Sequence, residues 1–111
     1  MSKPGVLFSS GKIRVRVRWD AWDAEYHCRI LRPHYLHGEE KIGEEHVHAA
    51  ADATIGSTFS TLLAASTALE RAVASGYVKR GEISWTRSQV PGVAFEVPTV
   101  LPVRKPARRR S

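Results

Sequence analysis

The sequence has very little cysteine, since Cys28 is the only one in 111 residues. An intramolecular disulfide is therefore excluded, whereas a short secreted domain would normally depend on several. The N-terminal segment has an apolar run of only three residues, too short for a signal-peptide core, and no later stretch approaches the ~20 apolar residues that span a bilayer. We expect a protein of a reducing compartment, the cytoplasm, that makes no membrane contact.

The sequence also lacks the local motifs of common catalytic sites. It contains no Gly-x-Ser-x-Gly turn, no glycine-rich phosphate loop before a helix and no Cys-His pair on regular elements. Gly56-Ser57-Thr58 has the composition of an anion site at a helix start, but such residues more often cap the helix. We therefore expect a binding protein with no enzymatic activity and no cofactor.

Positive charge is concentrated at the two ends of the chain. The last eight residues hold five positive charges and no acid, so residues 1–103 carry only +1 of the net +6. The five are Arg104, Lys105, Arg108, Arg109 and Arg110. Five more positive charges precede residue 20, whereas residues 20–45 carry −4. This segregation predicts either cross-strand ion pairs or two faces of opposite charge.

Residues 12–19 alternate basic and apolar side chains without a break, which is typical of a half-buried strand. The apolar positions are Ile13, Val15, Val17 and Trp19. The segment Asp20-Ala21-Trp22-Asp23 has turn formers at both ends, and residues 25–31 resume a β-type composition. An antiparallel hairpin is predicted, with its second strand ending at Pro33.

The next segments are less distinct. Residues 34–43 contain two glycines and several charges, so we expect a loop. Residues 44–53 suit either a helical turn or a third strand, and we favour the strand because the hairpin needs more sheet to shelter its apolar face.

One long helix is predicted from about Ser57 to Ser75, with Gly76 as its C-terminal cap. Its apolar face is expected to comprise Phe59, Leu62, Leu63, Leu69, Val73 and Tyr77. The opposite face carries mainly small side chains: Ser60, Thr61, Ala64, Thr67, Ala68 and Ala74. That face is either solvated or available to a second surface, such as another copy of the chain.

After the helix, alternating residues 83–87 and 93–97 flank Val90-Pro91-Gly92 and predict a second hairpin. Pro98, Pro102 and Pro106 then favour an extended arm. The fold class is therefore α+β, a small antiparallel sheet in the order β-β-(β)-α-β-β with one helix packed on one face. We expect residues 1–11 to be a lead-in, 12–97 a single domain and 98–111 a basic arm.

The basic strand suggests a nucleic-acid contact. Arg14, Arg16 and Arg18 project from one face at a spacing of ~6.5–7 Å, which suits contacts with successive phosphates, and Arg29 from the next strand can join them. The alternative is a solvated face neutralised by carboxylates. The arginines of the arm would add salt-sensitive affinity for phosphates, although such a tail can also bind an acidic protein surface.

Other residues suggest a protein partner or a metal. Trp22 lies in a turn, where it either anchors a partner or folds back over the sheet edge, and Glu39, Glu40 and Glu44 supply an acidic segment. Five histidines lie between residues 27 and 48, but neither His34-x-x-His37 nor His46-x-His48 with Cys28 matches a standard metal spacing. We therefore predict no metal site.

Three functions remain open. The first is a small binding protein of prokaryotic or phage type that contacts nucleic acid or a nucleoprotein assembly. The second is an inhibitor or adaptor that binds a protein, for example a host defence or toxin component. The third is a structural subunit whose arm becomes ordered inside a larger assembly, and self-association through the helix would favour it.

Overall fold

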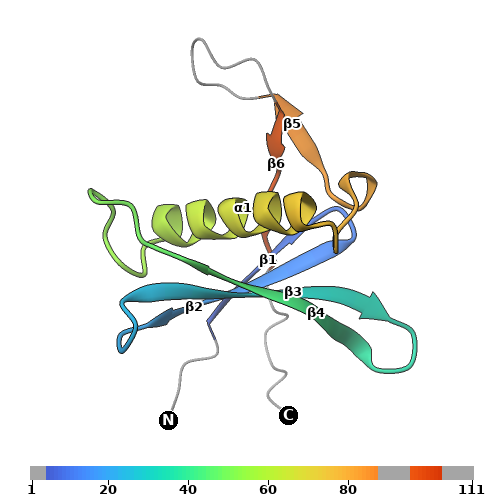
Figure 1. Cartoon of the computed structure of the whole chain (residues 1–111), viewed down its shortest axis with the longest axis horizontal. Helices are drawn as coiled ribbons and strands as arrows, with labels where there is room; N and C mark the ends of the chain where they lie inside the picture. The colour runs from blue at the N-terminus through green and yellow to red at the C-terminus, as the bar shows by residue number, and fades with distance from the viewer. Residues whose placement is uncertain (1–4, 88–95, 104–111) are drawn as a thin grey trace, which may run out of the picture.

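The computed structural model describes residues 5–87 and 96–103. Its elements are β1 (Val6–Ser10), β2 (Ile13–Asp20), β3 (Glu25–His34), β4 (Gly38–Val47), α1 (Thr58–Ser75), the 3-10 turn η1 (Arg80–Glu82), β5 (Trp85–Arg87), β6 (Glu96–Pro98) and β7 (Leu101–Pro102). Five strands form an antiparallel sheet in the order β4-β3-β2-β1-β7, and β5 pairs with β6. The helix α1 lies across one face of the larger sheet (Figure 1). The predicted α+β class is confirmed.

The hairpin of β2 and β3 is the element that the sequence predicts best. Ile13, Val15 and Val17 are at most 1% exposed, and Trp19 is partly buried against the same core. The paired strand β3 contributes Tyr26 and Ile30 to that inner face. The alternating side chains therefore place a set of basic residues on the face away from α1: Arg14, Arg16, Arg18, His27 and Arg29. Arg32 of β3 is an exception, because it contacts the segment after α1.

The loop predicted for residues 34–43 is wrong, because only residues 35–37 form the turn and β4 begins at Gly38. Likewise, Pro33 does not end β3, which continues to His34. Ile42 is an extra residue in β4, since Gly43 pairs with Ile30 while Lys41 pairs with Leu31. This β-bulge gives β4 a register that composition alone does not indicate.

Two further strands lie outside the range 12–97 in which the domain was expected. β1 pairs with β2 along its full length and buries Phe8, and β7 pairs with the other edge of β1. Val100, just before β7, is also buried. The first residues of the expected arm therefore belong to the sheet, while residues 104–111 lie outside the described part of the chain.

The helix begins and ends where the sequence predicts. The Ser57 hydroxyl accepts a hydrogen bond from the Ser60 backbone amide at 3.1 Å, which confirms the capping interpretation of Gly56-Ser57-Thr58. Gly76 has a φ of 90°, and its amide donates to the carbonyls of Ala72 and Val73. No helix in the described part is long and apolar enough to cross a bilayer.

The face of α1 that packs on the sheet is rotated from the predicted one, because Leu62, Leu69, Val73 and Tyr77 pack on the core as expected but Phe59 and Leu63 do not. Phe59 is 64% exposed and Leu63 is 40% exposed, whereas Leu69 is fully buried. The buried positions carry mostly small side chains: Ser60, Thr61, Ala64, Ala65, Ala68 and Ala72. These allow the helix to approach its own sheet closely, so the small-residue face is not open to another copy of the chain.

Polar contacts fix the two ends of α1 to the sheet. At the first turn, the Tyr26 hydroxyl lies 2.6 Å from the Ser60 hydroxyl and accepts from the Gly56 amide at 2.8 Å. Beyond the last turn, the Tyr77 hydroxyl donates to Glu45 at 2.7 Å, and its ring fills the space that a side chain at Gly43 would need. Glycine at position 43 is therefore a steric requirement of this helix–sheet contact.

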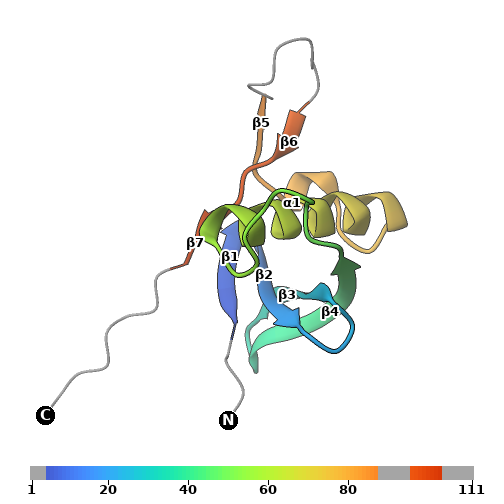
Figure 2. The same ribbon diagram turned by 90° about the vertical axis from the view of Figure 1, so that its left-hand side faces the viewer.

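Arg32 joins β3 to the segment after α1. Its guanidinium donates two hydrogen bonds of 2.9 Å to the Glu82 carboxylate and one of 3.3 Å to the Tyr77 carbonyl. The Arg32 contact, followed by a hydrogen bond from the Lys79 amide, holds the pKa of Glu82 below its usual value. Beyond this segment, β5 and β6 project away from the sheet on the helix side, as the view turned by 90° also shows (Figure 2).

The observed helix orientation predicts how two substitutions differ. Ala68→Leu adds volume to a fully buried contact and should destabilise the protein by about 1–3 kcal/mol. Phe59→Ala removes an exposed side chain and should change stability by less than about 1 kcal/mol. Urea unfolding measures the free energy of unfolding of both variants. A larger loss of stability for Phe59→Ala than for Ala68→Leu would contradict the observed helix orientation.

The Arg32–Glu82 pair predicts a pH dependence of stability. The folded-state pKa of Glu82 is lowered, so its contribution is present above the unfolded pKa of about 4.3 and is lost as pH falls through the folded value. Glu82→Gln should therefore cost stability at about pH 7 and cost less at about pH 2. Thermal unfolding across this pH range measures the difference in stability between the parent chain and Glu82→Gln. A difference that does not become smaller at low pH would contradict a stabilising role for the Arg32–Glu82 pair.

Candidate functional site

The outer face of the sheet, turned away from α1, brings together the charged side chains of three strands. Register aligns Arg16 with Arg29, and Arg18 with His27. On the other side of β3, His27 pairs with His46, and Arg29 pairs with Glu44. Sequence analysis predicted the arginines of β2 and Arg29 as neighbours, and the structure places them so.

These side chains surround a hollow of about 160 Å³ on the outer face. Its lining consists of Arg16, Arg18, His27, Arg29 and Glu44. Three arginines and one glutamate contribute to this lining, so the formal charge of the lining residues is positive. The volume exceeds that of one water molecule and has room for a hydrated tetrahedral oxyanion. Arginine forks are well suited to bind such an anion.

The acidic residue of this lining is already balanced by other groups. Glu44 lies 3.0 Å from the Lys41 ammonium and 3.1 Å from Nε2 of His46. Hydrogen bonds from Lys41 and then from His46 lower the pKa of Glu44 to about 2. In the described part of the chain, no ion pair links Glu44 to its cross-strand neighbour Arg29. The guanidinium of Arg29 is therefore exposed and available to an anion.

Two other arginines predicted from the sequence, Arg14 and Arg18, contact neighbouring side chains. Arg14 forms an ion pair with Glu39, with 3.0 Å between Nη1 and Oε2, and Arg14 does not line the hollow. Arg18 places Nη2 3.3 Å from Nδ1 of His27. The Arg14–Glu39 pair supports the alternative that carboxylates neutralise part of this face, and as a surface pair it is worth little stability.

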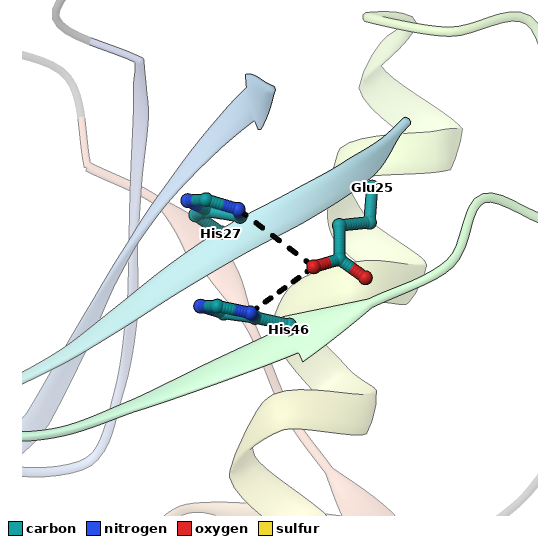
Figure 3. Close-up of side chains that lie close together, drawn as sticks. All are labelled: Glu25, His27 and His46. Atoms are coloured by element: carbon teal, nitrogen blue, oxygen red, sulfur yellow. Dashed lines mark ion pairs between the residues drawn. The ribbon is translucent and has the colours of Figure 1, made fainter. Parts of the chain in front are cut away.

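A second cluster lies beside the hollow, at the end of the sheet where β2 turns into β3. Nε2 of His27 lies 3.3 Å from Oδ2 of Asp20, 3.3 Å from Oδ2 of Asp23 and 3.8 Å from Oε1 of Glu25. Nδ1 of His46 lies 3.1 Å from the same Glu25 oxygen. Figure 3 shows both rings directed at that carboxylate. Either Glu25, His27 and His46 or Asp20, Asp23 and His27 are close enough to share a metal ion.

The other metal ligands considered from the sequence are not brought together. Cys28 points to the inner face beneath α1, where burial raises the pKa of its thiol to about 12. His34 and His37 stack on each other at the β3–β4 turn, at the other end of the hairpin. His48 is exposed and approaches only Glu25, at 4.0 Å. Sequence analysis missed the pairing of His27 with His46, because it follows from the register of β4.

The residues predicted to bind a protein are also separated. Trp22 lies in the β2–β3 turn and Glu39 and Glu40 lie beside the β3–β4 turn, at opposite ends of the sheet. Trp22 is 95% exposed, so it does not fold over the sheet edge. Its turn is held by Asp20, whose Oδ1 accepts from the amides of Trp22 and Asp23 at 2.9 and 3.1 Å. The Asp23 amide, more than any other group, lowers the pKa of Asp20.

Comparison with known proteins gives no match for this chain. No family model fits the sequence, and no curated protein and no solved structure matches it.

The exposure of Trp22 predicts that removal of its side chain hardly changes the stability of the fold. Trp22→Ala should shift the melting temperature by less than about 2 °C, because the side chain makes almost no contact that folding creates. Trp19→Ala is the matched control and should cost several degrees, because Trp19 packs edge-on against Tyr26 at 5.0 Å between ring centroids. Differential scanning calorimetry compares the two, and equal losses would show that Trp22 packs on the protein.

Proposed function

We propose that this protein binds nucleic acid through phosphate contacts on the outer face of its sheet. The observation that carries the proposal is the hollow lined by Arg16, Arg18 and Arg29. A phosphate placed there would meet guanidinium groups from two adjacent strands, held by backbone pairing. Because β2 and β3 are rigid core strands, the arginines need little reordering of the backbone to bind.

The chemistry of the lining favours contacts that do not depend on sequence. Apart from His27, no aromatic side chain lines the hollow. Stacking on aromatic rings supplies much of the affinity of single-strand binding proteins, so its absence favours phosphate contacts over base contacts. The net charge of +6 adds long-range attraction to a polyanion. The five basic residues of segment 104–111 are proposed to extend this contact along the nucleic acid.

A second candidate function is binding of a protein partner. Ile55, Phe59 and Leu63 are exposed at four-residue intervals on the outer side of α1 and the turn before it, and Trp22 is fully exposed at one end of the sheet. Exposed aromatic and aliphatic residues of this kind are typical anchors of protein interfaces. We rank it second because these residues are spread over separate parts of the surface.

The decisive experiment compares two variants that each lose two positive charges. Arg16→Gln with Arg29→Gln removes two arginines of the hollow, and Lys79→Gln with Arg87→Gln removes two exposed charges near η1 and β5. Binding to labelled single-stranded and duplex DNA and RNA is measured across a salt series. We expect the first variant to lose at least about tenfold in affinity and to reduce the salt slope by about 2, with a smaller effect of the second.

The control outcomes separate the alternatives. Truncation after Val103 should leave cooperative unfolding intact and flatten the salt dependence further, because five basic residues are removed. Equal losses in the two charge variants would show that net charge alone drives binding, and this would contradict a site in the hollow. No binding of the full chain near physiological salt would contradict the proposed function and favour a protein partner.

A further inference from the structure

We propose that Glu25, His27 and His46, completed by Asp20 or Asp23, form a binding site for a divalent transition-metal ion of the zinc type. This goes beyond the nucleic-acid contact and does not depend on it. Two groups of three ligands that share His27 lie at the end of the sheet where β2 turns into β3. In the first group the two imidazoles face the Glu25 carboxylate (Figure 3).

The distances between the ligand atoms match the size of a tetrahedral site. Zinc bonds to imidazole nitrogen and carboxylate oxygen are ~2.0–2.2 Å long, which places the ligand atoms of a tetrahedron ~3.3–3.6 Å apart. Around Nε2 of His27 the observed separations are 3.3 Å to Asp20, 3.3 Å to Asp23 and 3.8 Å to Glu25. Nδ1 of His46 lies 3.1 Å from Glu25. The separations around these two nitrogens are therefore close to those of a zinc site.

Nε2 of His27 is the atom that most needs such a partner. It is buried, and no hydrogen bond satisfies it in the described part of the chain, although three carboxylate oxygens lie close by. A buried polar nitrogen without a hydrogen bond is costly, and a coordinated ion would satisfy it. The same ion would offset the mutual repulsion of Asp20, Asp23 and Glu25.

The protein already orients two of the ligands. His46 presents Nδ1 to Glu25 while its Nε2 lies 3.1 Å from the Glu44 carboxylate, the arrangement in which an outer carboxylate fixes a metal-binding imidazole. Asp20 uses Oδ1 to hold the turn, which leaves Oδ2 facing His27. Cross-strand pairing also holds the rings of His27 and His46 next to each other, in a parallel stack with centroids 4.1 Å apart. An imidazole binds a metal ion in the plane of its ring, so one ring must tilt out of the stack for both to bind the same ion.

Binding would also require that the contact between His27 and Arg18 be broken. Nδ1 of His27 lies 3.3 Å from the Arg18 guanidinium, which can only donate, so Nε2 carries the ring proton when that contact is made. Coordination through Nε2 moves the proton to Nδ1 and displaces Arg18. This contact is single, long and exposed, so a metal ion can replace it.

The experiment titrates the full chain with Zn²⁺ by calorimetry and with Co²⁺ by visible absorption. We expect one ion per chain, an intense tetrahedral Co²⁺ spectrum and a melting temperature that rises with free Zn²⁺. His27→Gln with His46→Gln should weaken binding at least about a hundredfold, since two nitrogen ligands are lost. Glu25→Gln keeps both rings and nearly the same volume, and it should weaken binding at least about tenfold without unfolding the protein.

The matched control is His34→Gln with His37→Gln, which removes two surface histidines far from the cluster. It should bind Zn²⁺ as the parent chain does. Absence of saturable one-to-one binding in the parent chain would overturn the proposal. The proposal would also be overturned if the control variant lost Zn²⁺ binding while the variant with His27→Gln and His46→Gln retained it. Neither result bears on nucleic-acid affinity measured without metal, so this proposal and the proposed function fail separately.

Discussion

The close approach of α1 to the sheet is the constraint on which the rest of the structure depends. The buried face of α1 consists mainly of small side chains with Leu69 among them, so the helix lies near the strands and most of the large apolar side chains of the core come from β1, β2 and β3. The Tyr26 hydroxyl spans this contact, bonding to Ser60 in the first helical turn and to Gly56 just before the helix. Because the inner face is filled in this way, every charged side chain of β2 and β3 that alternates with it must face solvent.

Local sequence patterns predicted those elements whose side-chain periodicity fits only one secondary structure. Residues 12–19 alternate so regularly that both the strand and its buried face follow, and Ser57 and Gly76 mark the helix ends. The orientation of α1 followed only in part: Leu69 is buried as expected, but alanines occupy the positions nearest the sheet, and Phe59 and Leu63 are exposed. Steric fit between a helix and a sheet depends on side chains of both elements, which lie far apart in the sequence, so a local sequence pattern cannot predict it.

The strands that sequence analysis missed depend on distant partners. β1 and β7 are short, and β7 is joined to β1 across more than 90 residues of chain. Gly38 and Gly43 suggested a loop, yet Gly43 is needed because the Tyr77 ring occupies the space above it. The same limit applies to the site. The arginines were predicted from one strand, but the pairing of His27 with His46 required the register of β4 and its bulge at Ile42.

The outer face divides into a basic part and an acidic part, and His27 belongs to both. Its Nδ1 faces Arg18 of the hollow, while its Nε2 faces the carboxylates of the β2–β3 turn. A neutral imidazole carries one proton, so what occupies Nε2 determines whether Nδ1 accepts from Arg18 or donates. An ion at Nε2 would release Arg18 toward the hollow that it lines. Occupancy of the proposed metal site and the shape of the proposed anion-binding surface would thus be linked through a single ring.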